Sequence, residues 1–411
     1  MKTKYFIYLL LVFAGLQGCT PDEDMLVDFK EFEIAKIELG ADHRQVIADG
    51  VSTLTLNPML FQAYTYPTDE GKDSTVYGKI PVDRIVAGTV EFFMEDGTPL
   101  KDGKFRTTDV SKSEVGFYAI ANGLKSNVFK ASVRQPFADD AYDTIVYPVV
   151  FHIIQDRTKV DLGQGVGSDI VYYAFNTIYN CFARTASVSP NGADTKIRFR
   201  LAEYDPEGKK MAEKGINRYP MDYQAVYDLD SKAVKNNPAI CWDYKKYLNI
   251  WVIDDWSNVK APKYILNTAD LDGIKGISIT PMSLAEIEQQ DYTIFDIGLI
   301  YKARDFAIED VGYATEMGKF FGLLDTRWED YCDDTFTYST YVEPWNTLKN
   351  ASNSRLKITP DGLLFYSVNI MDNSSYKNTI SMDQVKRIRT ITDYCPHRWA
   401  WKSQWAFTGH D

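Results

Sequence analysis

The stretch "IVYPVVFHII", Ile145 to Ile154, is apolar at nearly every position. A strand that is buried on both faces of a sheet has this composition, whereas a strand with one wet face alternates apolar and polar residues. We therefore predict a fully buried strand here. The polar junction "PFADDAYDT", residues 136–144, precedes the strand and indicates a domain boundary near residue 136.

The chain after this strand changes period. In "SDIVYYAFNTIYNCFAR", residues 168–184, apolar side chains recur every three or four positions. This spacing predicts an amphipathic helix with Ser168 or Asp169 as its N-terminal cap. The runs "TKIRFRLAEY" and "KKYLNIWVID" further along predict more strands. Strands that alternate with a helix are typical of an α/β or α+β domain.

The region before the junction shows only strand signals. "STLTLN" alternates, and Asp-Gly pairs at 96–97 and 102–103 lie between strand-forming residues, as in β-hairpins. The order of strands and turns resembles the immunoglobulin-like β-sandwiches of bacterial surface adhesins. We therefore predict a multidomain protein, with an Ig-like β-sandwich over residues 30–136 and an α/β (α+β) domain over residues 137–411.

The N-terminus has the order of a secretory signal peptide. Lys2 and Lys4 precede a short apolar run that ends in "LQGC" at Cys19, and this run is too short for a membrane-spanning helix. The small residue before Cys19 resembles the lipobox of bacterial lipoproteins, which implies that residues 1–19 are the signal and that Cys19 is acylated. The alternative is an ordinary signal peptide with a chance cysteine.

The acidic run "TPDED" begins directly after Cys19. It resembles the export signal of Bacteroidetes surface lipoproteins, and we interpret residues 20–29 as an acidic tether. These resemblances imply an outer membrane lipoprotein that is exposed on the cell surface, with the lipid as its membrane contact.

The charge of the chain limits its binding partners, and its cysteines allow disulfides. Asp and Glu outnumber Lys and Arg by 57 to 45, which gives a net charge of -12, and no basic cluster could follow a phosphate backbone. We therefore exclude nucleic acid as a partner. In an exported chain, the four cysteines other than Cys19 could form two disulfides in any of three pairings. They are Cys181, Cys241, Cys332 and Cys395.

The segment "YATEMGKFFGLLDT", Tyr313 to Thr326, has the glycine and apolar spacing of a zinc-protease helix. Together with "YPVVFHII", "CWDYKKYLNIWVID" and "SMDQVKRIR" in the same order, it makes residues 145–398 resemble the metzincin metalloproteases of the pappalysin and cytophagalysin type, particularly lipoprotein members from Bacteroidetes. The resemblance implies a metzincin-like fold for residues 137–411.

The signature of that family is H-E-x-x-H-x-x-G-x-x-H followed by a methionine-containing turn. Two histidines one helical turn apart and a third beyond the glycine would hold zinc, and the glutamate would take a proton from the metal-bound water. The resemblance places the general base at Glu316, the turning glycine at Gly322 and the Met turn at Met371. The three ligand positions hold other residues, namely Thr315, Lys319 and Asp325.

These replacements remove the zinc chemistry. An ammonium at Lys319 repels a cation, a threonine hydroxyl is a poor zinc ligand, and Asp325 alone does not make a catalytic site. We expect no zinc. One hypothesis is that the Lys319 ammonium takes the cation's place as a buried partner of Glu316 and Asp325, hydrogen-bonded to Thr315. The alternative is that these side chains are solvated in an open cleft.

The remaining metal candidates are weaker. The four histidines, His43, His152, His397 and His410, stand outside any motif, and His152 within an apolar strand predicts a hydrogen-bonded core histidine. The loop "DYCDDT" offers carboxylates that suit calcium, and relatives in the resembled group carry structural calcium near it. Its other interpretation is an acidic surface loop. The carboxylates are Asp330, Asp333 and Asp334.

Three functions are compatible with these features. The first, which the ligand positions favour, is a surface-anchored lipoprotein whose inactive protease-like domain binds a protein, peptide or glycan ligand. The second is an active zinc-dependent endopeptidase of the pappalysin type, with Glu316 as its base. The third is a structural part of a surface assembly. The aromatic tail "RWAWKSQWAF" could stack a ligand, although packing is the commoner use of such residues.

Overall fold

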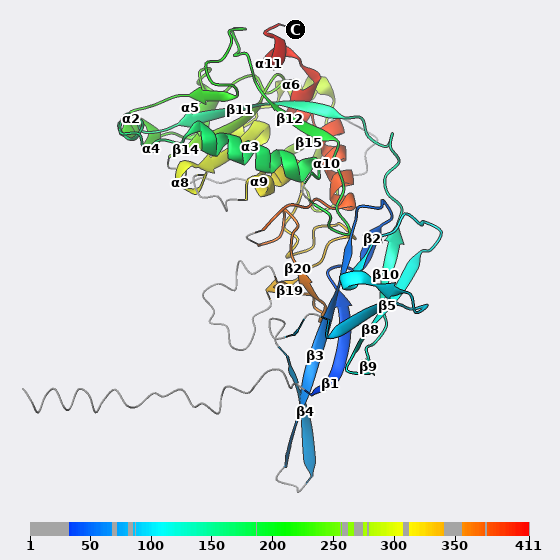
Figure 1. The fold of residues 1–411 in the computed structure, drawn as a ribbon. Coiled ribbons are helices and arrows are strands. Elements are labelled where there is room, and N and C mark those ends of the chain that lie inside the picture. The colour runs from blue at the N-terminus through cyan, green and yellow to red at the C-terminus, as the bar shows by residue number, and fades with distance from the viewer. Residues whose placement is uncertain are drawn as a thin grey trace, which may run out of the picture. The chain divides into compact units, whose positions relative to one another are not determined.

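The computed structural model describes residues 33–67, 72–80, 85–86, 88–185, 187–254, 256, 262–266, 274–277, 279–306, 312–340, 356–374 and 376–410. The chain forms two compact units, which divide as 1–40, 57–103 and 116–129 against 41–56, 104–115 and 130–411 (Figure 1). The predicted signal peptide, its Cys19 and the acidic tether lie outside the described residues. No helix in the described chain has the length and apolar character needed to cross a membrane.

The described part of the first unit consists of strands and turns, as predicted. Its strands, some of which run on into the second unit, are β1 (Ile34–Ala41), β3 (Leu54–Pro67), β4 (Asp73–Lys79), β5 (Val90–Met94), β6 (Pro99–Leu100), β8 (Glu114–Ala121), β9 (Leu124–Lys125) and β10 (Phe129–Arg134), with a 3-10 turn η4 (Lys101–Gly103). One sheet has the order β1-β3-β4, and in another β5 pairs with β6 and β8.

Both predicted Asp-Gly turns are present. Gly97 joins β5 to β6 at φ +90°, its amide donating to Met94 O at 2.9 Å. Asp102 of η4 also has a positive φ, 54°. These conformations favour Gly and Asp, which explains why the sequence signals were reliable there. The Ig-like topology stays a prediction.

The second unit contains the predicted α/β pattern. Its strands are β2 (Gln45–Ile47), β7 (Lys104–Phe105), β11 (Ile145–Ile154), β12 (Ile197–Leu201), β13 (Ile216–Arg218), β14 (Leu248–Ile253), β15 (Tyr264–Leu266), β16 (Ile279–Pro281), β17 (Gly298–Lys302), β18 (Ser339–Thr340), β19 (Leu356–Ile358) and β20 (Leu364–Tyr366). Its helices are α2 (Arg157–Asp161), α3 (Ser168–Phe182), α4 (Tyr223–Tyr227), α5 (Ser231–Lys235), α6 (Leu284–Gln289), α7 (Ile294–Ile297), α8 (Ala303–Phe306), α9 (Tyr313–Phe320), α10 (Met382–Tyr394), η6 (Pro396–Lys402) and α11 (Trp405–Thr408).

A parallel sheet forms the centre of this unit, in the order β12-β11-β14-β17, with β13 also paired to β11. The prediction of a doubly buried strand is confirmed for β11, in which only Val146 is not fully buried. Phe151 of β11 faces the core that contains α3, α9 and α10. Ile154 faces the opposite core, beneath α5 and α7. Apart from His152, the strand is apolar because both of its faces are covered.

Helix α3 has the predicted amphipathic stripe, and it contacts α9 on one face of the sheet (Figure 1). Val171, Ala174 and Ile178 are among its buried residues. The predicted cap is wrong by one or two residues: the N-cap is Gly167, and Ser168 is already the first helical residue. Gly167 leaves the helix start without a side-chain hydrogen bond, so packing of the apolar stripe must supply its stability.

The units do not divide the chain at the predicted boundary near residue 136. Segment 41–56 belongs to the second unit, where β2 pairs in parallel with β10 and the amides of Ile47 and Thr53 donate to Pro190 O and Val188 O. A composition change along the sequence cannot reveal such an interleaved division, because each pairing joins segments far apart in the chain.

A candidate binding cleft beside helix α9

Helix α9 carries the zinc-protease-like segment and ends where that segment predicts. The chain turns at Gly322, which has φ +88°. A Cβ at this position would lie 2.7 Å from Ile391 Cγ1 of α10. Both the backbone conformation and the close approach of α10 therefore require glycine here. The predicted role of Gly322 as the turning residue agrees with this geometry.

The predicted Met turn lies directly against α9. Met371 is buried, and a Cβ added to Gly318 would lie 2.9 Å from its Sδ. The Thr315 hydroxyl donates to Ile370 O at 2.6 Å and accepts from Lys377 Nζ at 3.0 Å. Thr315 thus fastens the helix to the turn. Lys377 was not expected at the site, because nothing in the local sequence links it to a helix more than sixty residues earlier.

Of the charge-replacement hypothesis, only the contact between Lys319 and Glu316 is present, and it is not buried. Lys319 Nζ lies 2.7 Å from Glu316 Oε1, one helical turn away, and the two side chains are 46% and 37% exposed. The rest of the hypothesis is wrong. Asp325 is exposed and accepts from the Arg327 amide at 2.9 Å instead, and Thr315 bonds to the Met turn. The pair is therefore half-exposed rather than buried.

Glu316, Lys319 and Asp325 are nevertheless brought together, on the wall of a cleft of about 540 Å³. The Tyr264 hydroxyl donates to Lys319 O and so ties β15 to α9 along this cleft. Most of the other lining side chains are apolar. The full lining is Trp256, Pro262, Lys263, Tyr264, Gly276, Ile277, Phe295, Gly298, Leu299, Ile300, Glu316, Lys319, Leu323, Leu324 and Asp325.

The donor set on α9 does not fit the zinc that the sequence resemblance implies. The Lys319 ammonium occupies the position of the second histidine of the motif, and the Thr315 hydroxyl donates to Ile370 O. Zinc in catalytic sites takes three nitrogen, sulfur or carboxylate ligands. Across the described residues, no three His, Cys, Asp or Glu side chains are grouped closely enough to hold a metal ion.

The prediction of a core histidine at His152 is confirmed. The ring is fully buried, with Nε2 2.8 Å from Asn249 Oδ1 and Nδ1 accepting from Asn217 Nδ2 at 2.9 Å. Burial lowers the pKa of His152 to about 4. His397 is also buried, against Tyr244, and His410 is exposed near the end of the described chain.

Two carboxylates of the "DYCDDT" loop are occupied by protein donors. Asp330 accepts from the Thr335 hydroxyl at 2.8 Å, and Asp334 accepts from Ser381 Oγ at 2.5 Å and Arg134 Nη1 at 2.9 Å. Asp333 is exposed. The loop thus belongs to a polar network rather than to a free acidic surface, and calcium binding stays a prediction.

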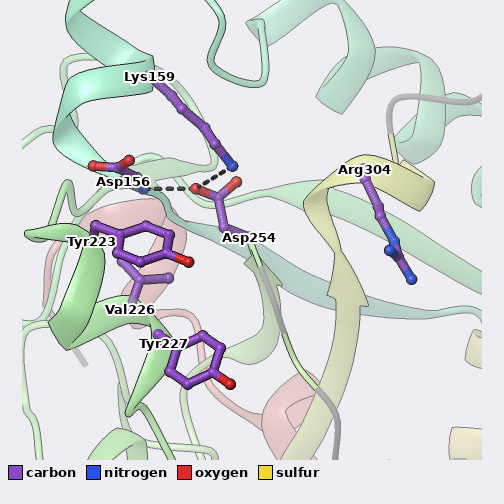
Figure 2. A pocket seen from close by; sticks show the side chains of 7 residues that line it. All are labelled: Asp156, Lys159, Tyr223, Val226, Tyr227, Asp254 and Arg304. Atoms are coloured by element: carbon purple, nitrogen blue, oxygen red, sulfur yellow. Dashed lines mark hydrogen bonds and ion pairs between the residues drawn. The ribbon is translucent and has the colours of Figure 1, made fainter.

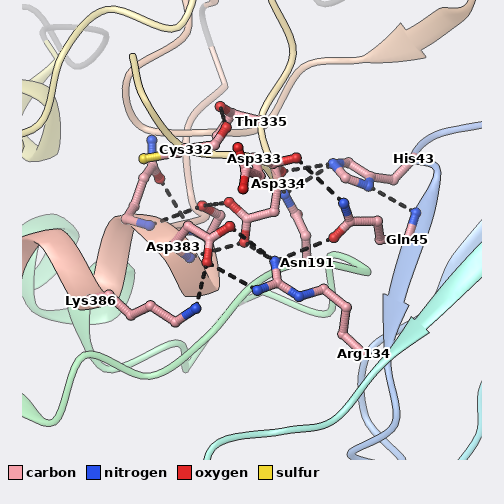
Figure 3. Close-up of polar contacts among 12 residues, drawn as sticks. His43, Gln45, Arg134, Asn191, Cys332, Asp333, Asp334, Thr335, Asp383 and Lys386 are labelled. Atoms are coloured by element: carbon pink, nitrogen blue, oxygen red, sulfur yellow. Dashed lines mark hydrogen bonds and ion pairs between the residues drawn. The ribbon is translucent and has the colours of Figure 1, made fainter. Parts of the chain in front are cut away.

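The polar network around Asp334 is drawn in Figure 3, and the sequence did not predict it. Arg134 bridges Asp334 and Asp383, with ion-pair distances of 2.9 and 3.0 Å. His43 Nε2 donates to Asp334 O at 3.0 Å, and burial lowers its pKa to about 4. Asn191 Nδ2 also donates to Asp334 O, at 2.6 Å. No sequence signal could have grouped bonded residues that are up to 291 positions apart.

The predicted disulfides are not formed: all four described cysteines are free thiols. Their surroundings explain this. Cys181 is in the core around α3, Cys241 packs against the core beneath α5 and α7, and Cys395 lies with Ile391 against β15. Cys332 lies in the acidic loop. An even cysteine count predicts pairing only where the fold brings sulfurs together.

The aromatic tail "RWAWKSQWAF" packs against the protein core, which is the use that the sequence favoured over ligand stacking. Trp405 and Phe407 belong to a core cluster with Tyr247, and Trp405 Nε1 donates to Asp205 O at 3.0 Å. Trp401 packs against the large core beside α3.

Comparisons with known proteins give structural neighbours only. No family model matches the chain, and no curated protein matches it. Solved structures that are similar to it include the metallopeptidase mirolysin in complex with a compound, at 18% identity and a TM-score of 0.41 over 65% of this chain and 98% of that one. Mature mirolysin of Tannerella forsythia with a cleaved peptide is 18% identical, with a TM-score of 0.39 over 64% and 97%. A mutant of T. forsythia promirolysin is 17% identical, with a TM-score of 0.38 over 64% and 85%.

Proposed function

We propose that the cleft beside α9 holds a peptide or protein segment without hydrolysing it. The observation that carries this proposal is the Glu316–Lys319 ion pair on the cleft wall. A general base must be free to take a proton from a positioned water. Here the carboxylate in that position is neutralised by an ammonium that itself occupies a ligand position. The helix is retained, whereas the residues that would bind the metal ion and the unpaired base that hydrolysis requires are not.

The lining of the cleft favours a peptide with apolar side chains. Leu299, Leu323 and Phe295 form part of the wall, and Lys263, Glu316 and Asp325 add charge to it. A volume of about 540 Å³ lies within the range of ligand pockets. Apolar walls bind side chains by removing them from water, and a few charged groups can orient the ligand backbone.

The proposal includes a surface-anchored lipoprotein, on the grounds of the N-terminal sequence. Replacing Cys19 by Ala removes the acylated residue and with it the lipid that would hold the protein to the membrane. We expect the wild-type protein in the membrane fraction of its cells and Cys19→Ala in the soluble or secreted fraction. Retention of Cys19→Ala in the membrane at the wild-type level would contradict the anchor.

The function of the cleft is tested on the purified protein in one experiment with three readouts. After incubation with zinc and dialysis, we expect zinc far below one ion per chain and no cleavage of a random peptide library. We also expect the same library to yield bound peptides enriched in apolar residues. Leu324→Asp should weaken that binding about tenfold, because it places a charge on the apolar wall.

The matched control is Leu162→Asp, which adds the same charge at an exposed position outside the cleft. It should bind peptides like the wild type. Stoichiometric zinc that is lost on chelation, together with peptide cleavage that is abolished in Glu316→Gln, would overturn the proposal in favour of the zinc endopeptidase. Peptide capture that survives in Leu324→Asp would place binding elsewhere on the molecule.

A further inference from the structure

A second pocket, of about 210 Å³, lies at the edge of the parallel sheet where its strands end (Figure 2). Asp156 follows β11, Asp254 follows β14, and Arg304 lies in α8 directly after β17. Tyr223 and Tyr227 belong to α4, which follows β13. Because these strands are parallel, their carboxyl ends meet at one edge. Ligands in open α/β sheets bind outside this edge.

Two tyrosines form the aromatic wall of the pocket. Tyr223 and Tyr227 lie one helical turn apart on α4, with ring centroids 6.3 Å apart and ring planes inclined by 25°. They are 62% and 61% exposed, whereas Val226 between them is buried and holds α4 against the core. Two nearly parallel aromatic faces are thus held in place and left open to solvent, which favours a ligand with a flat apolar face.

The remaining lining supplies fixed polar groups of both signs. Asp254 Oδ2 accepts from the Asp156 amide at 2.7 Å, and Asp254 Oδ1 accepts from Gln155 Nε2 at 3.2 Å. Lys159 Nζ lies 3.4 Å from Asp254 Oδ2. Figure 2 shows Asp254 between the two tyrosines on one side and Arg304 on the other. The two carboxylates and the two cations balance in formal charge.

This balance decides the class of ligand. A pocket without net charge attracts neither an anion nor a cation strongly. Neighbouring donors and acceptors suit hydroxyl groups instead, since each hydroxyl both donates and accepts a hydrogen bond. A pyranose ring combines several hydroxyls with a flat C–H face, and its size suits a pocket of about 210 Å³ that is too small for a peptide segment.

We propose that this pocket binds one neutral hexopyranose residue of a glycan. The ring stacks on Tyr223 and Tyr227, and its hydroxyls bond to Asp254, Lys159 and Arg304. The site shares no lining residue with the cleft beside α9, so it stands or falls independently of peptide binding.

The test is saturation-transfer NMR on the purified protein with the methyl glycosides of glucose, galactose, mannose and N-acetylglucosamine. We expect at least one of them to bind. Tyr223→Ala should weaken that binding by roughly three- to tenfold through the lost stacking. Lys159→Met should weaken it about tenfold through a lost hydrogen bond to a charged group. Tyr77→Ala, at an exposed tyrosine of the first unit, is the matched control and should leave binding unchanged.

Three results would overturn the proposal. One is that none of the four glycosides binds. The second is that binding is undiminished in Tyr223→Ala, which would place the sugar elsewhere. The third is that free glycine displaces the sugar, which would identify a pocket for zwitterions. Both pocket variants alter side chains that are about half exposed or more, and tryptophan fluorescence during unfolding checks that each has folded.

Discussion

Replacing Arg134 by Met is expected to destabilise the second unit by about 3–5 kcal/mol at pH 7, because it leaves a buried carboxylate without its cation. Arg134 Nη1 lies 2.9 Å from Asp334 Oδ2, and Arg134 Nη2 lies 3.0 Å from Asp383 Oδ1. The Asp334 side chain is 0% exposed, so water cannot replace the guanidinium. Lys386 also pairs with Asp383 at 2.8 Å, which leaves Asp334 as the group that loses most.

The pH dependence of this loss has a definite sign. Burial, together with the charge of Asp383, raises the pKa of Asp334 to about 6. Without Arg134 the carboxyl holds its proton still more firmly, and a protonated carboxyl needs no counter-ion. The cost of Arg134→Met should therefore be largest well above pH 6 and should shrink as the pH falls toward 6, below which Asp334 of the wild type is protonated as well.

Denaturant unfolding followed by tryptophan fluorescence measures this effect selectively, since all eight tryptophans lie in the second unit. Arg44→Met is the matched control. Its partner is Asp361, and both side chains are about half exposed, so the loss should stay below about 1 kcal/mol. Equal losses for Arg134→Met and Arg44→Met would show that the buried network contributes little to stability.

Acid should destabilise the second unit through its buried histidines, and His152 is the cleanest case. The folded-state pKa of His152 is about 4, against an ordinary value of 6.5. As the pH falls below 6.5, the unfolded chain binds a proton that the folded protein refuses until about pH 4. Stability from this residue is therefore complete above pH 6.5 and lost between pH 6.5 and 4, by roughly 2.5 kcal/mol at pH 4.5.

The measurement compares unfolding free energies at pH 7 and 4.5 for the wild type and His152→Gln. His43 and His397 act in the same direction, while Asp330 and Asp334, whose pKa burial raises to about 6, act in the opposite one. The difference between the two proteins isolates His152. We expect the variant to lose roughly 2.5 kcal/mol less than the wild type. An identical loss in both proteins would contradict a neutral buried ring.

The elements that could be predicted are those in which the pattern of neighbouring residues shows which faces are buried. Apart from His152 and Asn249, β11 and β14 are apolar because both faces are covered, and α3 shows its buried stripe every three or four residues. The Glu316–Lys319 pair followed from helical spacing alone. These features depend on neighbours within one helical turn or one strand, which is the range over which a sequence pattern is informative.

The features that could not be predicted depend on distant segments. Asp325 turns to its own neighbour, the Arg327 amide, because its direction depends on the loop after Gly322 rather than on the helix. Lys377 and Arg134 reach their partners across 62 and 200 positions. The pocket at the edge of the parallel sheet is lined by residues from five elements or their ends, and no two of its polar groups form a motif in the sequence.

Because the two units are interleaved along the chain, few gene fragments could encode a complete second unit. A gene fragment that begins at residue 137 would encode β11, α9 and α10 yet omit segment 41–56 and Arg134, which belong to the same compact unit. Its product would expose the backbone groups of Val188 and Pro190 and would leave Asp334 without its guanidinium partner. Recombination is therefore expected to move the second unit only as part of the whole chain, and ligand studies require that whole chain as well.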